Sequence, residues 1–556
     1  MPRLESETVE PLLAGLAALG EPGATDLASA APGSLADWLA TVPLGVLPAI
    51  ADVLRRRIRW GWQYGEPTAA RMSERRQLQR QTAALAELPA NSLLTALASL
   101  HGSGYVREAA LRRLLDGCDG SEVPFLLLRC NDWVPAIAQL AQAGIRARLR
   151  PEYARHLLHS YRLIELLQHA QRNALSDLLR ELRGTLLQPA AWPVLQGARN
   201  HADKQVRRAA YLLHAEALPT AEAESPEAGL RELLLSALQS PDLWLRIWAA
   251  RTARTRLYGR ALVEVLSPAQ RDRSAPVRRE ALLAFLDDFP ELRRSLLDPC
   301  AGLRAMVRFY LRKKAHLDFD ALYRHELGTA WQADCADSSP ATVRRICIAL
   351  DGLGETAGSA AQPKPTTAPP DAATHADGPS LSPEVFLYDA RPRVRKSALR
   401  ALVRSDHRAD KAPSLAALQA ALADRSAGVV RCALELLASE AGGAALLRLG
   451  ADTLWQAFCS RSEPGTRRRI LSALGQFGRW TRLGYLLRAC DEPDPQIATM
   501  ARRAVAVALS GQIYTRPTSS ERDRVEQALA QLATLGDDPD CRALARSVRS
   551  ALAAIT

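Results

Sequence analysis

Apolar residues recur at helical spacing along most of this chain. The stretch ADKQVRRAAYLL at 202–213 shows the pattern most clearly, because four of its apolar residues fall at i, i+3, i+4 and i+7: Val206, Ala209, Ala210 and Leu213. Residues at this spacing share one stripe of a helix, which the adjacent arginines flank. We interpret the stretch as the second helix of a two-helix repeat.

The same order of residues returns along the chain: an apolar anchor, usually an arginine directly after it, and usually a small residue four positions after the anchor. The anchors stand at positions 106, 206, 245, 277, 303, 343, 394, 430 and, in a weaker copy, 497. A small residue lets the partner helix approach closely, so Val307 and Leu434 predict wider packing. Asp203, Asp242 and Asp494 stand where N-caps are expected. Intervals of 39 residues from 206 to 245 and 32 from 245 to 277 are typical of helical hairpins.

This series of copies resembles the HEAT family of helical repeats, in particular the short bacterial HEAT-like repeats also found in phycobilin lyases. The resemblance rests on the anchor–Arg–x–x–Ala pattern after a polar turn and covers roughly 90–353 and 383–556. It implies an all-α fold, an α-solenoid of stacked antiparallel helix pairs.

The order of the pattern along the chain predicts four regions. Residues 1–89 form a helical N-terminal cap region, and 90–353 form a first repeat lobe. Residues 354–382 are rich in Pro, Ala and Thr and lack an apolar period, so we expect a disordered linker or loop. Residues 383–556 form a second repeat lobe.

Composition and charge set only broad limits on function. The chain is 47% hydrophobic and 24% charged, as in ordinary globular proteins. Its net charge of +12 permits contact with nucleic acid but is spread along the whole chain. Nine scattered cysteines without a CxxC pair, and the absence of a signal peptide or an apolar run of membrane-spanning length, predict a cytoplasmic protein.

The arginines that follow the anchors admit two interpretations. They are Arg107, Arg207, Arg246, Arg278, Arg304, Arg344, Arg395 and Arg431. Along a solenoid they would form a ladder, which is either a basic groove for phosphates or a set of structural ion pairs. The pairing alternative, which we favour, requires acidic partners in the turns, such as Asp203, Asp242, Asp389 or Asp424.

The most basic helix is LRAMVRFYLRKK at 303–314. Leu303, Met306, Val307, Tyr310 and Leu311 form its expected buried stripe, and no acid lies within it. The cations therefore lack a partner within the helix, which makes this helix the best candidate for an anion contact. They are Arg304, Arg308, Arg312, Lys313 and Lys314.

A second candidate lies in LWLRIWAARTARTR at 243–256. Trp244, Trp248 and Arg251 stand at i, i+4 and i+7, so they share a helix face that suits a peptide or a stacked base. Trp248 also lies three residues after the anchor Leu245, a core position in other copies, and core filling is the interpretation we favour for it.

No motif in the sequence specifies catalysis, a phosphate cradle or a cofactor. GxGxxG, GxxxxGK[ST] and GxSxG do not occur. His156 and His159, with Glu152 and His169 nearby, lack the HExxH spacing and any cysteine, so no metal site is predicted. We therefore predict no catalytic, cofactor or metal residues.

The favoured function is a non-enzymatic scaffold that binds a protein partner on the solenoid surface. The alternative is a nucleic-acid-binding protein similar to bacterial HEAT-like DNA glycosylases, because Trp244, Asp242 and Arg246 are residue types used there. The chain is about twice too long for that family, and no catalytic residue carries over. Phycobilin-lyase-like action ranks third. The oligomeric state stays open.

Overall fold

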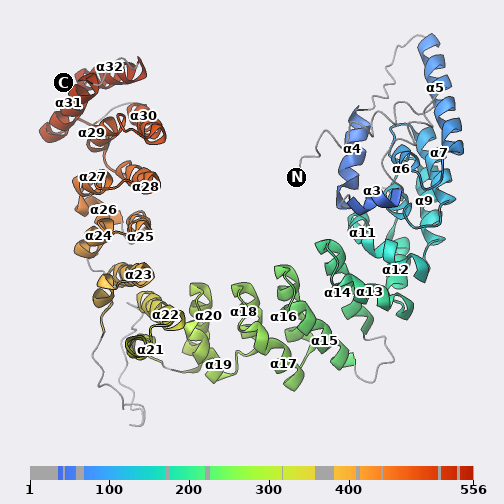
Figure 1. The fold of residues 1–556 in the computed structure, drawn as a ribbon, viewed down its shortest axis with the longest axis horizontal. Coiled ribbons are helices and arrows are strands. Elements are labelled where there is room, and N and C mark those ends of the chain that lie inside the picture. The colour runs from blue at the N-terminus through green and yellow to red at the C-terminus, as the bar shows by residue number, and fades with distance from the viewer. Residues whose placement is uncertain are drawn as a thin grey trace. The chain divides into compact units, whose positions relative to one another are not determined.

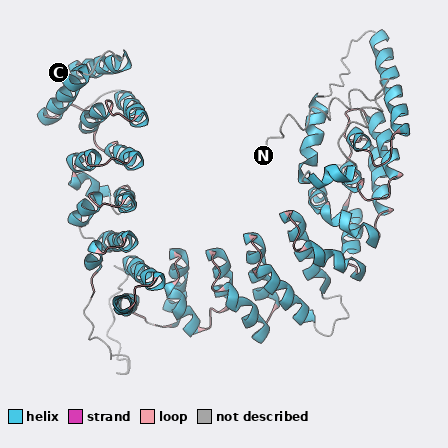
Figure 2. Cartoon of the chain, viewed as in Figure 1, coloured by secondary structure: helices cyan, strands magenta, loops and turns pink. Residues whose placement is uncertain are grey.

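The computed structural model consists of helices joined by turns. Every regular element in the part of the chain that it describes is helical, and no strand occurs there (Figure 2). The predicted all-α fold is therefore confirmed. The described residues are 35–41, 44–57, 68–169, 174–218, 226–315, 317–356, 381–408, 414–439, 443–510, 515–534 and 539–554.

The chain divides into two compact units, Met1–Ala284 and Phe285–Thr556. The predicted first lobe, 90–353, thus extends across this division. Helix α22 continues to Thr356, and most of the predicted linker, 357–380, lies outside the described residues.

Unit 1 contains the described helices of the predicted cap region and the first copies of the repeat. Its elements are α3 (Leu35–Thr41), η1 (Leu44–Val46), α4 (Leu47–Arg57), α5 (Thr68–Glu87), α6 (Leu93–Ala98), α7 (Gly104–Leu115), α8 (Val123–Arg129), α9 (Pro135–Arg146), η2 (Pro151–Tyr153), α10 (Ala154–His159), α11 (Tyr161–Gln168), α12 (Ser176–Leu187), η3 (Pro189–Ala191), α13 (Trp192–Ala198), α14 (Lys204–Ala217), α15 (Pro226–Leu238), α16 (Leu243–Arg256), α17 (Gly259–Ala269) and α18 (Ala275–Ala284).

Unit 2 continues the same plan to the C-terminal helices. Its elements are α19 (Phe289–Arg294), η5 (Ser295–Leu297), α20 (Ala301–Lys314), α21 (Phe319–Ala336), α22 (Pro340–Thr356), η7 (Pro383–Tyr388), α23 (Pro392–Arg408), α24 (Leu415–Leu422), α25 (Ala427–Leu437), α26 (Gly443–Leu449), α27 (Ala451–Cys459), α28 (Pro464–Leu474), α29 (Arg479–Ala489), α30 (Pro495–Leu509), α31 (Ser519–Thr534) and α32 (Pro539–Ala553).

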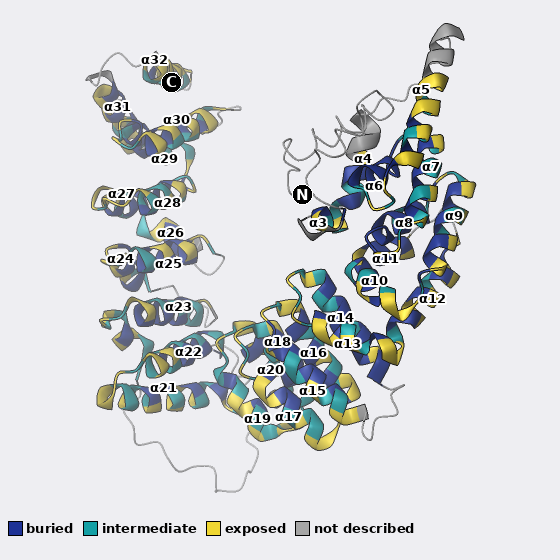
Figure 3. Ribbon diagram, turned by 45° about the vertical axis from the view of Figure 1, so that its right-hand side comes forward, coloured by how far each residue is buried: buried dark blue, intermediate teal, exposed yellow. Residues whose placement is uncertain are grey.

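Within each unit the helices pack as successive pairs. We call the first helix of a pair the A helix and the second the B helix, as in α15–α16 and α17–α18 of unit 1. The A helices α13, α15 and α17 lie on one side of their row and the B helices α14, α16 and α18 on the other (Figure 1). Burial is greatest where a helix faces its own partner and the neighbouring pairs (Figure 3). The stack of antiparallel helix pairs defines an α-solenoid.

All nine copies of the repeat pattern lie in B helices, and their polar turns begin these helices as expected. The carboxylate of Asp203 accepts a hydrogen bond from the N–H of Gln205 at 2.8 Å, and that of Asp242 accepts one from the N–H of Trp244 at 3.0 Å. Asp494 caps α30 in the same way. Each cap satisfies an N–H that has no partner within the helix.

The alanines four positions after the anchors are buried at the contacts between helices, and Cys347 is partly buried. The alanines at 110, 210, 249, 281, 398 and 501 are fully buried. The larger residue Val307 is also fully buried at this position, and Leu434 is nearly so. Close approach is most evident between α22 and α23. A Cβ added to Gly354 would lie 2.7 Å from the Cα of Ala401, so only glycine fits without a backbone shift. This contact joins the helices on either side of the predicted linker.

Candidate interaction surface

Arg107 shows what the arginine after an anchor does. Its side chain is 1% exposed, and its Nη1 donates to the carbonyl oxygens of His101 at 3.1 Å and Gly102 at 2.7 Å, in the turn before α7. Nε and Nη2 each donate to a carboxylate oxygen of Asp132 at 2.9 Å, in the turn before α9. The guanidinium therefore joins one turn to the next and is neutralised in the interior.

The same geometry recurs in both units. Nη1 of Arg246 donates to the carbonyl of Ser240 at 2.9 Å, and its Nε donates to Asp272 at 2.8 Å. Arg395 donates to both oxygens of Asp424 at 2.7 and 2.8 Å. We use the name rung arginine for an arginine whose Nη1 donates a hydrogen bond to the carbonyl oxygen six residues earlier. The rung arginines are Arg107, Arg207, Arg246, Arg278, Arg304 and Arg395. The structural-pair interpretation is confirmed at Arg107, Arg246 and Arg395, and the basic groove is wrong for them.

The predicted ladder is also wrong at its two remaining positions. In α25 the position of a rung arginine, six residues after the turn residue Asp424, is occupied by Val430, which is fully buried. Arg431 lies one position later and is exposed. In α22, Arg344 is exposed, and it is Arg345 that pairs with Glu326. The position of the turn, which the anchor pattern does not show, sets the register here.

Burial divides the basic row predicted in α20. Arg304 and Arg308 are 1% and 6% exposed, and both donate to the carboxylate of Glu355 in α22. Arg308 also donates to the hydroxyl of Tyr323 at 3.0 Å. No acid lies within this helix, as the sequence showed, but Glu355 of α22 neutralises Arg304 and Arg308 from outside it. Arg304 and Arg308 are not accessible to an outside anion.

The C-terminal end of α20 is exposed. Arg312, Lys313 and Lys314 all lie on the surface. The Lys313 ammonium lies 4.3 Å from the ring centroid of Phe309, which the predicted stripe did not include and which is exposed. Lys314 pairs with Asp287 at 2.7 Å. The three cations remain candidate anion contacts, but they form a small patch.

Trp244 and Trp248 lie on the B helix α16 of unit 1, which contacts α14 through Arg208 and Tyr211 and packs against α18. Trp244 is 40% exposed, and the Arg208 guanidinium carbon lies 5.0 Å from its ring centroid. Arg208 is held in turn by two hydrogen bonds to Asp242 at 2.7 and 2.9 Å. The hydrogen bond from Arg208 is the main reason that the pKa of Asp242 is lowered. The Arg208 guanidinium therefore contacts both the ring of Trp244 and the carboxylate of Asp242.

Trp248 lies at the edge of the core and is half-buried. Its ring centroid is 6.3 Å from that of Tyr211 in α14, with the planes tilted by 59°. Tyr211 is buried, and its hydroxyl lies 2.9 Å from the hydroxyl of Ser236. Trp248 therefore both contacts the interior and keeps part of its ring on the surface.

Arg251 is exposed, but its guanidinium is anchored to α18. Its Nη2 donates to Glu280 at 2.9 Å, and Nη2 of Arg254 donates to the other oxygen of the same carboxylate at 3.3 Å. Burial disfavours the charged form of Glu280, yet these bonds prevail and lower its pKa. We name the whole set the aromatic–arginine surface: Arg208, Tyr211, Trp244, Trp248, Arg251 and Glu280.

Sequence spacing predicted Trp244, Trp248 and Arg251 as one face, and the structure brings them together on α16. The spacing did not identify Arg208 and Glu280, because these residues come from neighbouring helices. A signal for Arg208 is its place directly after a rung arginine, where the side chain turns outward. Glu280 had no comparable signal in the sequence.

The residues compared with DNA glycosylases are already engaged in structural contacts. Asp242 caps α16 and pairs with Arg208, and Arg246 is buried against Asp272. They do not converge on an open site around Trp244.

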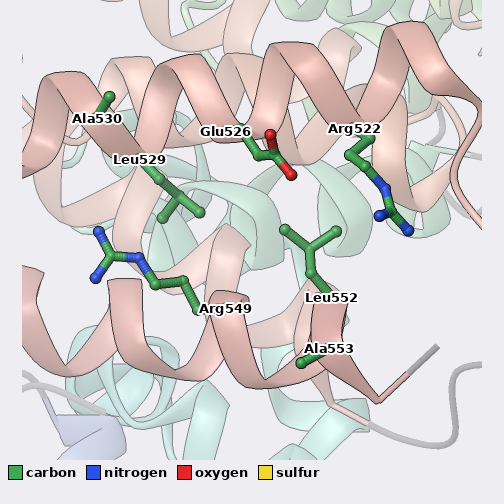
Figure 4. A pocket seen from close by; sticks show the side chains of 7 residues that line it. All are labelled: Arg522, Glu526, Leu529, Ala530, Arg549, Leu552 and Ala553. Atoms are coloured by element: carbon green, nitrogen blue, oxygen red, sulfur yellow. The ribbon is translucent and has the colours of Figure 1, made fainter. Parts of the chain in front are cut away.

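Among the described residues, unit 2 also contains a surface groove at its C-terminal helices. A shallow groove of about 410 Å³ between α31 and α32 is lined mainly by alkyl groups, with Arg522, Glu526 and Arg549 around Leu529 and Leu552 (Figure 4). No cluster of three His, Cys, Asp or Glu side chains that could hold a metal ion occurs among the described residues. Within the same residues, no helix has the length and apolarity to cross a membrane.

His101 lies in the turn before α7 and is expected to make this turn sensitive to acid. It is buried, and its Nδ1 accepts a hydrogen bond from the N–H of Ser103 at 3.0 Å. Burial, followed by the charge of Arg107, lowers its pKa from 6.5 to about 4. The unfolded chain therefore binds a proton between about pH 6.5 and 4 that the folded chain does not bind, so stability falls as the pH drops through this window.

We expect the thermal unfolding midpoint of unit 1 to fall between pH 7 and pH 5, with His101 contributing about 2 kcal/mol over this range. His101→Asn keeps an acceptor for Ser103 without the titration and should reduce the dependence. Some dependence remains, because the pKa values of His159 and His214 are also lowered to about 4. An equal pH dependence in the variant would contradict this role.

The paired helices define the class of protein as an all-α solenoid. No protein-family model matches the chain, and no curated protein shows significant similarity to it. Among solved structures it is similar to Kap95p in a complex with RanGDP, at 12% identity over 91% of this chain and 66% of that one, with a TM-score of 0.34.

Two further structures show a comparable likeness. A homology model of the full-length AP-3 complex is 13% identical over 99% of this chain and 93% of that chain, with a TM-score of 0.32. The C-terminal fragment of the Chaetomium thermophilum cohesin loader SCC2 is 13% identical over 90% and 46%, with a TM-score of 0.31.

Proposed function

We propose that this chain is a non-enzymatic scaffold that binds a protein partner on the aromatic–arginine surface of α14, α16 and α18. The observation that carries the proposal is Trp244, an exposed tryptophan held by the Arg208–Asp242 pair. Tryptophan, tyrosine and arginine dominate the binding energy of protein interfaces. A ring that is already ordered loses little conformational entropy when a partner covers it.

The charges on this surface favour a protein over a nucleic acid. Arg208 is neutralised by Asp242, and Arg251 and Arg254 share Glu280. A phosphate backbone would have to compete with these carboxylates, whereas a protein interface accommodates paired charges at its rim.

We further propose that the repeat is of the HEAT-like class and that the short bacterial repeats are the subgroup it resembles. All nine cysteines are free thiols, which supports a reducing, cytoplasmic setting.

The test is differential affinity capture. Immobilised wild-type chain should recover a reproducible set of proteins from native lysate, and Trp244→Ala should reduce that recovery at least about tenfold, because truncation of a central tryptophan at an interface typically costs 2 kcal/mol or more. The unfolding midpoint should change little, since the side chain is partly exposed.

Tyr258→Ala is the matched control, because Tyr258 is a 75% exposed aromatic residue that precedes the A helix α17. Its recovery should equal that of the wild type. Unchanged recovery with Trp244→Ala, or equal losses in both variants, would contradict the proposal. Release of alkylated bases from treated DNA would instead favour the glycosylase-like alternative.

A further inference from the structure

Positive charge is concentrated on the B helices of unit 2. By sequence, basic residues number six in α23, one in α25, three in α28 and two in α30, against one acid each in α23 and α25. The neighbouring A helices α24, α26, α27 and α29 carry four basic residues and one acid. The excess therefore follows one side of the helix pairs.

Three of these cations occupy equivalent places in successive B helices. Lys396, Arg431 and Arg468 each stand two positions after a buried residue at the helix start, namely Val394, Val429 and Thr466. The helices α23, α25, α28 and α30 pack against one another in series. The Sγ of Cys432 lies 3.9 Å from the carbonyl oxygen of Lys396, and Arg468 donates to Gln496 of α30 at 2.6 Å. The three cations thus form one column.

The column differs from the paired arginines beside it. Arg395 pairs with Asp424, and Arg467 pairs with Glu492. Within the described residues, no carboxylate forms an ion pair with Lys396, Arg431 or Arg468. The same holds for Arg393, Arg469 and Arg503 on these helices, all three of which are exposed. Together these six residues are the basic face: Arg393, Lys396, Arg431, Arg468, Arg469 and Arg503.

We propose that the basic face binds an acidic segment of a protein partner in an extended conformation. The inference deepens the proposed scaffold function and rests on it. Packed helices lie roughly 8–10 Å apart, and an extended chain rises about 3.3 Å per residue, so every third residue of a bound segment meets the next cation of the column. Carboxylates at that spacing complement Lys396, Arg431 and Arg468.

The composition of these helices favours a peptide over single-stranded nucleic acid. Proteins that hold single strands combine cations with aromatic rings on which bases stack. The helices α23, α25, α28 and α30 contain no Phe, Tyr or Trp. Arginine offers paired donors that match a carboxylate, and five of the six residues of the basic face are arginines.

The experiment titrates the full chain into a fluorescein-labelled peptide of six Glu-Gly-Gly repeats and follows fluorescence anisotropy at low and raised salt. We expect binding at low salt that weakens as salt increases. The double substitution Arg431→Glu and Arg468→Glu should weaken the affinity at least about tenfold. Arg448→Glu, a charge reversal at an exposed arginine of the A helix α26, should leave it unchanged.

Three outcomes would overturn the proposal: no binding of the peptide at low salt, an equal loss with Arg448→Glu, or tighter binding of a 20-base-pair DNA duplex that the double substitution abolishes. The last result would assign the face to nucleic acid. The titration also separates this proposal from the scaffold function, because Trp244→Ala should leave the peptide affinity unchanged while it reduces partner capture.

Discussion

Replacing Asp132 by alanine is expected to destabilise unit 1 by about 3–5 kcal/mol. The carboxylate accepts hydrogen bonds from Arg107 at 2.9 Å and from Arg129 at 2.9 Å, and it is 1% exposed. Its removal leaves buried guanidinium groups without their counter-charge, which is far more unfavourable than losing an exposed pair. Its Oδ1 also accepts the N–H of Val134 at 2.9 Å, so the turn before α9 loses this hydrogen bond as well.

Hydrogen exchange is the suitable measurement, because a chain of many repeats does not unfold in one step. Amides of α7 and α9 should exchange at least about a hundredfold faster in Asp132→Ala. Glu108→Ala is the control, since Glu108 pairs with Arg112 at the surface, and its effect should stay within about 0.5 kcal/mol. Similar effects of the two substitutions would contradict the assignment of Arg107 to the interior.

Glu355→Gln is expected to destabilise the contact between α20 and α22 in unit 2 by a similar amount, about 3–5 kcal/mol. Glutamine keeps the volume of the side chain but not the charge that neutralises Arg304 and Arg308. Both guanidinium groups are buried, and burial by itself disfavours a charge. Amides of α20 and α22 should lose protection, whereas those of unit 1 should not.

The control for this substitution is Glu326→Gln in the adjacent helix α21. Glu326 pairs with Arg345, whose side chain is 43% exposed, so Glu326→Gln should have a small effect. If Glu355→Gln were as mild as Glu326→Gln, or if Arg308→Leu restored nothing in the Glu355→Gln background, the buried cluster would not stabilise unit 2.

The sequence predicted the helices well because their signals are local. Anchors such as Val106 and Val394 and the alanines four residues later lie within one helix, and a period of 3.6 residues identifies them without knowledge of the neighbours. The register failed at Val430, where the position of the turn residue Asp424 decides which side chain turns inward.

The charged residues could not be assigned from local pattern. Arg304 and Arg308 resemble an exposed basic row until α22 supplies Glu355, 47 to 51 residues further along the chain. The same limit applies to the aromatic–arginine surface: Trp244 and Trp248 share one helix and were found together, whereas Glu280 comes from the next pair. Spacing along a helix identifies a face, and only packing identifies its partners.

We propose that a protein partner binds the B-helix side of unit 1. The most direct measurement is hydrogen–deuterium exchange of the chain, free and with the partner captured by the wild type. Protection should increase in α14, α16 and α18 and remain unchanged in α13, α15 and α17, which lie on the other side of the row (Figure 1). Protection confined to α13, α15 and α17, or none within unit 1, would contradict the claim.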